Sequence, residues 1–205
     1  MRNYLIKSPW WLKAFYSNLT WNMSTDEKIV YITFDDGPTP EITEWVMEQL
    51  AKHQALGTFF LIGKNVVENP KIYQQLKDSG HSIGNHTLNH LNGWKHTSSD
   101  YVNNVKVCQD LLHPTTLFRP PYGRIKRKQA QILNKAYNII MWDILSGDFD
   151  TSIDGERCYQ NVVKHIQPGS IIVFHDSLKA WPRLQIALPK TLEYLKEKGF
   201  RMEAL

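Results

Sequence analysis

The feature that most constrains this chain is a regular alternation of two kinds of segment that begins at residue 28. Short runs rich in β-branched and aromatic residues alternate with stretches that repeat apolar residues at helical spacing, without a linker-like break. Such alternation predicts a parallel β-sheet with helices packed outside it. The runs expected to form strands are residues 29–34, 58–62, 81–84, 117–119, 138–142, 170–174 and 201–205.

Helices are expected between these strands. Thr39 is placed to cap a helix that begins at Pro40, where the missing N–H of proline costs nothing. Apolar residues at helical spacing predict another helix over residues 101–112. Further helices are expected near residues 69–79, 126–136, 155–166 and 183–198.

Polar residues that follow the strands favour a barrel over an open sheet. They stand just beyond the C-terminal ends of several different strands. In a barrel these ends converge on one mouth, whereas an open doubly wound sheet spreads them along an edge. The chain carries neither GxGxxG nor GxxxxGK[ST], so nothing in it indicates a nucleotide site. We therefore expect an α/β fold, a single-domain barrel of parallel strands.

Length and composition fit one globular domain preceded by a short arm. The chain has 205 residues, of which 42% are hydrophobic and 21% charged, which excludes a disordered chain and a coiled coil. We expect residues 1–27 to form an N-terminal arm packed on a domain that spans 28–205. The net charge of +4 is small, so no nucleic-acid partner is expected. The chain is also predicted to be a monomer. Cys108 and Cys158 are expected to be reduced core thiols.

The N-terminal segment shows neither a secretory signal nor a membrane span. Lys7, Ser8, Pro9 and Lys13 interrupt every apolar stretch there, so the chain is expected to be leaderless and, by sequence, cytoplasmic. The favoured interpretation is an arm folded over the domain. A second interpretation, an arm that rests on a membrane surface, stays open because of a cluster of apolar and aromatic residues. The cluster consists of Trp10, Trp11, Leu12, Phe15, Tyr16 and Trp21.

An aspartate pair ends the first predicted strand. Asp35 and Asp36 stand next to each other where a buried strand meets a Gly-Pro turn. Two adjacent carboxylates repel each other in a site of low dielectric, and a cation beside them removes that cost. The alternative is an exposed acidic turn that merely ends the strand.

A histidine pair follows the third predicted strand. His86 and His90 are four residues apart, and on a helical turn this spacing points both imidazoles the same way. Alone, such a pair is more often two surface or core histidines, but together with one carboxylate of the aspartate pair it predicts a three-ligand zinc site. Such a site leaves a fourth position open, which is typical of a catalytic zinc rather than a structural one.

Polar residues after three later strands complete the candidate site. The prolines after Arg119 favour a rigid, extended turn that leaves the backbone N–H of Tyr122 facing the mouth. Arg119 could pair with a carboxylate and hold it ionised. His175, with Asp148 as a candidate neighbour, is suited to general acid catalysis at neutral pH. The alternatives are a surface salt bridge for Arg119 and a core histidine for His175.

Together these residues resemble the polysaccharide deacetylase (NodB homology) family, also called carbohydrate esterase family four. The resemblance spans about residues 28–200. Five motifs stand in the family's order, which makes the resemblance far more specific than any one motif would. They are TFDDGP at 33–38, HTLNH at 86–90, RPPYG at 119–123, SGDF at 146–149 and VFHD at 173–176.

The resemblance implies a distorted (β/α)₇ barrel and metal-dependent removal of N- or O-acetyl groups from sugars. By match to the family's motifs, Asp35 is the expected general base. The expected metal ligands are Asp36, His86 and His90, with Zn²⁺ as the expected ion and Co²⁺ as another that would serve.

The resemblance also implies roles for the remaining motif residues. Arg119 matches the residue that orients the base, and the backbone N–H of Tyr122 matches the donor to the oxyanion. His175 matches the general acid, with Asp148 as its partner. The chain departs from the usual pattern outside these positions, at Leu91, Leu145, Phe149 and Val173, which bears on the pocket shape and the substrate.

The expected function is hydrolysis of N-acetyl groups on N-acetylglucosamine-type sugars of a poly- or oligosaccharide. Three alternatives stay open: an O-acetyl esterase on an acetylated glycan, a non-catalytic glycan-binding module, and a protein whose metal is structural. Because members of the family commonly meet envelope glycans, association with the cell envelope also stays open.

Overall fold

The structure is a computed structural model that describes residues 4–205, so residues 1–3 of the expected arm lie outside the described residues. Its strands are short and most of their residues are buried. They are β1 (Ile29–Asp35), β2 (Gly57–Leu61), β3 (Ser82–Asn85), β4 (Leu117–Phe118), β5 (Asn138–Ile139), β6 (Ile144–Leu145), β7 (Ile171–His175) and β8 (Arg201–Met202).

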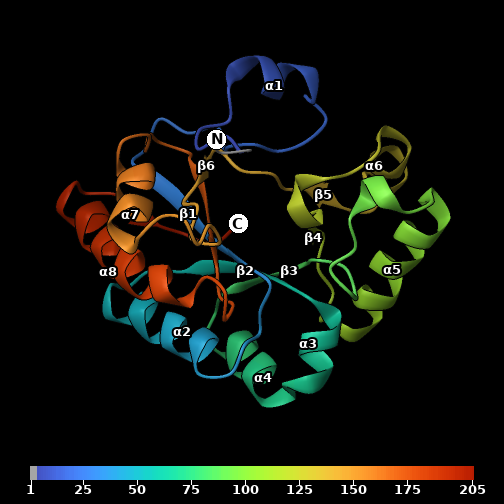
Figure 1. Ribbon diagram of the computed structural model, residues 1–205, viewed down its shortest axis with the longest axis horizontal. Helices are drawn as coiled ribbons and strands as arrows, with labels where there is room; N and C mark the ends of the chain where they lie inside the picture. Colours follow the sequence, from blue (N-terminus) through green and yellow to red (C-terminus); the bar gives the residue numbers. More distant parts are fainter. Residues whose placement is uncertain (1–3) are drawn as a thin grey trace.

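The strands form one parallel sheet that curls into a half-barrel, with helices around its outside (Figure 1). The order along the sheet is β5-β4-β3-β2-β1-β7-β6, and β8 pairs with the beginning of β1. Among the described residues no ladder joins β5 to β6, so the wall is open between these two strands. The predicted fold class, a single-domain barrel of parallel strands, is confirmed in this distorted form.

The helices cover the outer face of the sheet, and most lie where the sequence predicts them. They are α1 (Trp10–Phe15), α2 (Ile42–Lys52), α3 (Gly63–Glu68), α4 (Pro70–Asp78), α5 (Ser98–Leu111), α6 (Arg127–Leu133), α7 (Gly155–Val163) and α8 (Trp181–Glu197), with 3₁₀ turns η1 (Gly93–Lys95) and η2 (Pro121–Gly123).

Three local predictions need correction. The helix expected to begin at Pro40 begins at Ile42, with Glu41 as its N-cap, because the Thr39 N–H binds Thr43 Oγ1 (2.7 Å) instead of the Thr39 side chain capping a helix. The short strand β6 was not predicted, and the run expected over 138–142 is a strand only at its first two residues. Helix α3 was not predicted either, because six residues are too few to display helical periodicity.

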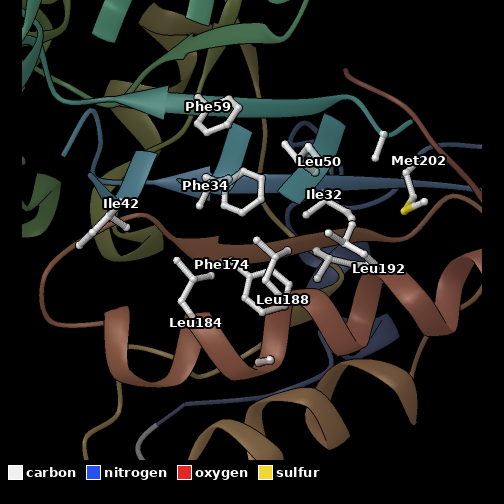
Figure 2. Packing of buried hydrophobic residues seen from close by; sticks show 14 of the residues in the cluster. Ile32, Phe34, Ile42, Leu50, Phe59, Phe174, Leu184, Leu188, Leu192 and Met202 are labelled. Atoms are coloured by element: carbon white, nitrogen blue, oxygen red, sulfur yellow. The ribbon is translucent and has the colours of Figure 1, made fainter. Parts of the chain in front are cut away.

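The main hydrophobic core lies between the sheet and α8. In Figure 2, Leu184, Leu188 and Leu192 point from α8 toward Phe34 of β1 and Phe174 of β7. All five side chains are completely buried. This packing fixes β1 and β7, the neighbouring strands whose C-terminal ends carry polar residues. Both cysteines are buried and neither forms a disulfide, as predicted.

The N-terminal segment runs along the two strand edges that face the open side of the half-barrel. Lys7 bridges to Ile144 of β6, and Thr20 bridges to Ile140 just after β5. Figure 1 shows α1 arching over this side of the molecule. The segment has an inner and an outer face: Leu19 and Trp21 are buried, whereas Trp10, Trp11 and Phe15 are more than half exposed (80%, 55% and 71%).

A buried carboxylate ties the N-terminal segment to the sheet. Asp143, which is completely buried, forms ion pairs of 2.5 Å with Lys7 and with Lys13. It also accepts a hydrogen bond of 2.7 Å from Ser170 Oγ. Within the described residues, no helix is long and apolar enough to cross a membrane.

Candidate active site

Parallel register brings the polar residues that end or follow the strands to one end of the sheet. Asp35, the last residue of β1, lies beside His175, the last residue of β7. Asn85 of β3 pairs with Phe118 of β4, so the residues that follow them, His86 and Arg119, leave the sheet next to each other. The geometry of the strand ends therefore assembles a site from segments that are far apart in the sequence.

Asp35 and Arg119 form a buried ion pair at the base of this site. The distance between Arg119 Nη1 and Asp35 Oδ1 is 2.7 Å, and Arg119 is completely buried. Its other hydrogen bonds go to Thr33 Oγ1 (2.7 Å) and the carbonyls of Ile140 (3.3 Å) and Met141 (2.9 Å). These bonds hold the guanidinium rigidly in place.

The ion pair keeps Asp35 ionised in spite of its burial. Burial acts to raise the pKa of Asp35, but the Arg119 guanidinium together with His86 and His175 outweighs it, and the pKa lies below its ordinary value. The face of the guanidinium also stacks on the Phe60 ring, 4.1 Å from its centroid. Asp35 is therefore a buried carboxylate in its charged form, able to accept a proton.

Asp36, His86 and His90 form a cluster beside Asp35. One potential ligand atom from each residue lies within 4.8 Å of the others. The His90 Nε2 atom is 3.2 Å from Asp36 Oδ1, and the His86 Nε2 atom is 3.8 Å from it. Among the described residues, no other group of histidine, cysteine and acidic side chains has the geometry to hold a metal ion.

The protonation states of the two imidazoles suit a cation rather than a mutual hydrogen bond. The His86 Nδ1 atom lies 2.7 Å from the Arg119 carbonyl oxygen, which only accepts, so Nδ1 carries the proton and Nε2 carries a lone pair. Burial lowers the pKa of His86 to about 4 and also lowers the pKa of His90, so both rings are neutral at neutral pH.

The cluster fits a divalent metal ion. Asp36 Oδ1 is buried and receives no hydrogen bond, although it faces the two imidazoles. A buried acceptor without a donor is costly, and a cation bound by this oxygen and two ring nitrogens removes the cost. One carboxylate and two neutral imidazoles are ligands typical of Zn²⁺ and related transition metals.

The predicted reason for the convergence of the two histidines is wrong, although the convergence itself occurs. Residues 86–90 form an irregular loop instead of a helical turn, with positive φ angles at Thr87 (67°) and His90 (54°). Hydrogen bonds from Leu88 N to Asn104 Oδ1 (2.8 Å) and from Leu91 N to Thr87 Oγ1 (3.1 Å) hold the loop. The two ring centroids lie 5.1 Å apart.

Asp148 and His175 form a second polar pair at the same end of the sheet. The His175 Nδ1 atom lies 2.7 Å from Asp148 Oδ1, and the His175 backbone N–H donates to Asp148 Oδ2 (2.7 Å). Burial acts to lower the pKa of His175, but the Asp148 carboxylate outweighs it and raises the pKa to about 9. His175 is therefore a cation at neutral pH, with a proton to give.

Tyr122 lies at the rim of the site. Its side chain is 59% exposed, and its ring centroid is 4.5 Å from that of the metal-cluster residue His90. The backbone is left-handed at Tyr122 (φ 60°) and at Gly123 (φ 65°), so the expectation of an extended turn fails there. Gly123 is required by space as well, because a Cβ atom would lie 2.6 Å from the Trp142 ring.

Two residues that sequence reasoning did not assign hold the site together. Thr33 binds the Arg119 guanidinium, and its position two residues before Asp35 on β1 puts both side chains on the same face of the strand. Asp176 accepts hydrogen bonds from Gly37 N (3.1 Å) and Thr43 Oγ1 (2.5 Å), which fixes the turn after Asp36. Its place directly after His175 in the sequence is the signal from which Asp176 could have been found.

A cavity of about 970 Å³ lies away from these residues. It is lined at the amino ends of β3, β4 and β5, the opposite end of the sheet from Asp35 and His175. It includes none of the predicted site residues. The chemistry-bearing side chains, rather than this cavity, define the candidate site.

Comparisons with known proteins identify the family. A family model described as "Polysaccharide deacetylase" matches residues 22–138. The chain is 35% identical over 189 residues to a peptidoglycan-N-acetylglucosamine deacetylase of Bacillus cereus, with 89% of both chains covered. It is 34% identical over 161 residues to a chitooligosaccharide deacetylase of Azorhizobium caulinodans, covering 75% of this chain and 76% of the relative.

A solved structure agrees with these matches. The crystal structure of a peptidoglycan N-acetylglucosamine deacetylase in complex with a naphthalenyl N-oxidanyl-benzamide superposes with a TM-score of 0.85 at 28% identity. The match covers 97% of this chain and 95% of the other. The chain therefore belongs to the polysaccharide deacetylase family, as its motifs predict. Its class is that of hydrolases that cleave carbon–nitrogen amide bonds of acetylated polysaccharides.

Proposed function

We propose that this protein removes N-acetyl groups from N-acetylglucosamine-type units of a poly- or oligosaccharide, with a divalent metal ion, an aspartate base and a histidine acid. The observation that carries the proposal is the unpaired, buried Oδ1 atom of Asp36 between His86 and His90. It stands beside an ionised carboxylate, Asp35, and near a protonated imidazole, His175.

Asp36, His86 and His90 would hold the ion, with Zn²⁺ proposed and Co²⁺ as another ion that fits the ligands. When bound, such an ion supplies Lewis-acid chemistry, which makes water more acidic and polarises a carbonyl group. The neutral state of both imidazoles supports this assignment, because a histidine must be neutral to bind a metal.

Asp35 would act as the general base that takes the proton from the attacking water. Its ion pair with Arg119 keeps it ionised and fixes the carboxylate, because Thr33 and two main-chain carbonyls hold the guanidinium. A carboxylate that is already charged and oriented needs no rearrangement before it accepts the proton.

His175 would act as the general acid that protonates the leaving amine. The Asp148 carboxylate binds its Nδ1 atom, which leaves Nε2 as the ring atom that can donate to the substrate. An amine departs poorly without a proton, so a histidine that stays protonated to about pH 9 suits an amide substrate. The backbone N–H of Tyr122 is proposed as a donor to the oxyanion, where one such donor contributes about 3–4 kcal/mol.

The identity of the glycan is proposed by analogy with the relatives. The relatives act, by their names, on peptidoglycan N-acetylglucosamine and on chitooligosaccharides, which share the N-acetylglucosamine unit. This shared unit supports amide hydrolysis over the alternative, an O-acetyl esterase. A non-catalytic glycan-binding module needs neither an ionised base nor a protonated acid, both of which this site contains.

The decisive experiment measures acetate release from N-acetylglucosamine oligomers, peptidoglycan and an O-acetylated glycan. Each reaction is run with the purified protein, after chelation, and after zinc is added back. We expect release from the N-acetylated substrates that chelation abolishes and zinc restores. Faster release from the O-acetylated glycan would favour the esterase. Binding without release would favour the binding module, and a lower melting temperature after chelation without any hydrolysis would favour a structural metal.

Oligomeric state and location remain predictions. We propose a monomer, which light scattering of the purified protein would test. Peptidoglycan substrates lie in the cell envelope, so a role there competes with the cytoplasmic location predicted from the sequence. Fractionation of cells followed by immunodetection separates the two.

A further inference from the structure

The beginning of the described chain runs along β6 and the loop that follows it. The Ser8 N–H donates to the Asp143 carbonyl (2.9 Å), and the Leu145 N–H donates to the Ile6 carbonyl (2.8 Å). Lys7 pairs with Ile144 in antiparallel orientation. Residues 6–8 thus extend the sheet beyond β6, the strand that leads directly to the Asp148 loop.

Tyr4 continues this line of contacts onto that loop. Its hydroxyl donates a hydrogen bond to Asp150 Oδ2 (2.7 Å), and its ring meets the Phe149 ring edge to face, with centroids 5.0 Å apart. Asp150 Oδ1 in turn accepts from the Ser152 backbone N–H (2.9 Å). The tyrosine therefore touches the loop at a ring and at a carboxylate.

Phe149 connects Tyr4 to the acid–base pair. Its ring meets the His175 imidazole at 5.3 Å between centroids and an interplanar angle of 74°. On its other side, His175 binds Asp148 through Nδ1. The hydrogen bond fixes one atom of the imidazole, and the edge-to-face contact restricts rotation of the ring about that atom.

We propose that the N-terminal segment is part of the active site, in which Tyr4 acts through Phe149 as a positioning residue for His175. The proposal rests on the proposed function, because it assigns Tyr4 to the support of the general acid. It differs from a purely structural role for the segment, in which the contacts to β6 would stabilise the fold without affecting proton donation.

The expected loss of rate on removal of the Tyr4 ring follows from how far His175 would move. A misplacement of about 1 Å in a catalytic group can cost about a hundredfold in rate. Loss of the Tyr4 ring would loosen Phe149 while leaving the Asp148–His175 hydrogen bond in place, so we expect a smaller loss of about tenfold. Proton donation matters for an amide and not for an activated aryl ester, whose leaving group departs without a proton.

The test compares Tyr4→Ala with matched variants of the same segment on two substrates. Tyr4→Phe keeps the ring and loses the hydroxyl, Trp10→Ala removes an exposed ring, and Lys13→Met weakens the anchor to Asp143. We expect Tyr4→Ala to lower kcat/KM about tenfold on an N-acetylglucosamine oligomer and less than about threefold on an aryl acetate. Tyr4→Phe should recover most of the loss, and Trp10→Ala and Lys13→Met should not separate the substrates. Equal losses on both substrates in Tyr4→Ala would overturn the proposal.

A second measurement is independent of activity. The Nδ1 proton of His175, held by Asp148, gives a downfield proton resonance whose exchange with water reports how firmly the ring is held. We expect faster exchange in Tyr4→Ala and no change in Trp10→Ala. An unchanged exchange rate in Tyr4→Ala would count against the proposal. If His175→Ala itself affects both substrates equally, the assignment of the acid fails instead, and the resonance alone decides whether Tyr4 holds the ring.

Discussion

Arg119 Nη1 lies 2.7 Å from Asp35 Oδ1, and both side chains are removed from solvent. Removal of one member of such a pair leaves a buried charge without a partner, which costs about 3–5 kcal/mol. We therefore expect Arg119→Met to lower the free energy of unfolding by about that amount, measured by urea denaturation. The matched control is Arg124→Met, because Arg124 is exposed and stacks on Trp94. Equal effects of the two substitutions would contradict the importance of the buried pair.

Asp35 and Asp36 are adjacent, and their proposed roles separate in two matched variants. Asp35→Asn should keep the metal and lose about a hundredfold or more in kcat, because a base is lost and the ligands remain. Asp36→Asn should lose both metal and activity. The measurements are metal content after dialysis and acetate release. Full activity in Asp35→Asn, or full metal content in Asp36→Asn, would refute the respective assignment.

The pKa of His175 sets an upper limit to the active pH range. His175 is protonated below about pH 9 because Asp148 raises its pKa, with smaller contributions from Asp36 and Asp35. An acid works while it is protonated, so activity on an amide should fall as pH rises through this value. Asp148→Asn lowers the pKa, and the alkaline limb of kcat/KM should move to lower pH. An unmoved limb in this variant would show that another group limits the rate.

Asp143 makes the stability of the fold depend on pH. Burial acts to raise its pKa, but hydrogen bonds from Lys13, Lys7 and Ser170 outweigh burial and lower it. For a carboxylate with a lowered pKa in the folded state, the stabilisation is present above the unfolded pKa and is lost as pH falls through the folded one. We expect Asp143→Asn to cost about 1.5–3 kcal/mol at pH 7.

The cost of Asp143→Asn should shrink when urea denaturation is repeated below about pH 4, since the unfolded wild-type chain then takes up a proton at Asp143, and it should vanish once pH falls below the lowered pKa of the folded state. Asp110→Asn is the matched control, because Asp110 is exposed on α5. A pH-independent difference between Asp143→Asn and the wild type would mean that packing, and not charge, accounts for the loss.

The sequence predicts the fold class because the main strands and helices are long enough to show their periodicity. The seven-residue strand β1 and the helix α5 are examples. It does not predict β6, because β6 begins two residues after the end of the single run expected over residues 138–142. It also does not predict the open side between β5 and β6, which depends on backbone pairing with residues distant in the sequence.

The candidate site is predictable where residue type and spacing carry the chemistry. The sequence predicts that Asp36, His86 and His90 converge, and their potential ligand atoms do lie close together. It wrongly predicts a helical turn over residues 86–90, which form a loop whose path depends on Asn104 in α5. The support from Tyr4 could not be predicted, because a lone tyrosine near a terminus has no motif. Its partners, Phe149 and Asp150, become its neighbours only when the chain has folded.

The bridging of the half-barrel by the N-terminal segment also constrains the order in which the protein folds. Lys7 is synthesised well before its partner Asp143, which follows 136 residues later. This segment must therefore wait, with Leu19 and Trp21 not yet buried, until the strands it pairs with have been synthesised. Completion of this wall is therefore a late event in folding, and the apolar side chains that it buries stay in contact with water until then.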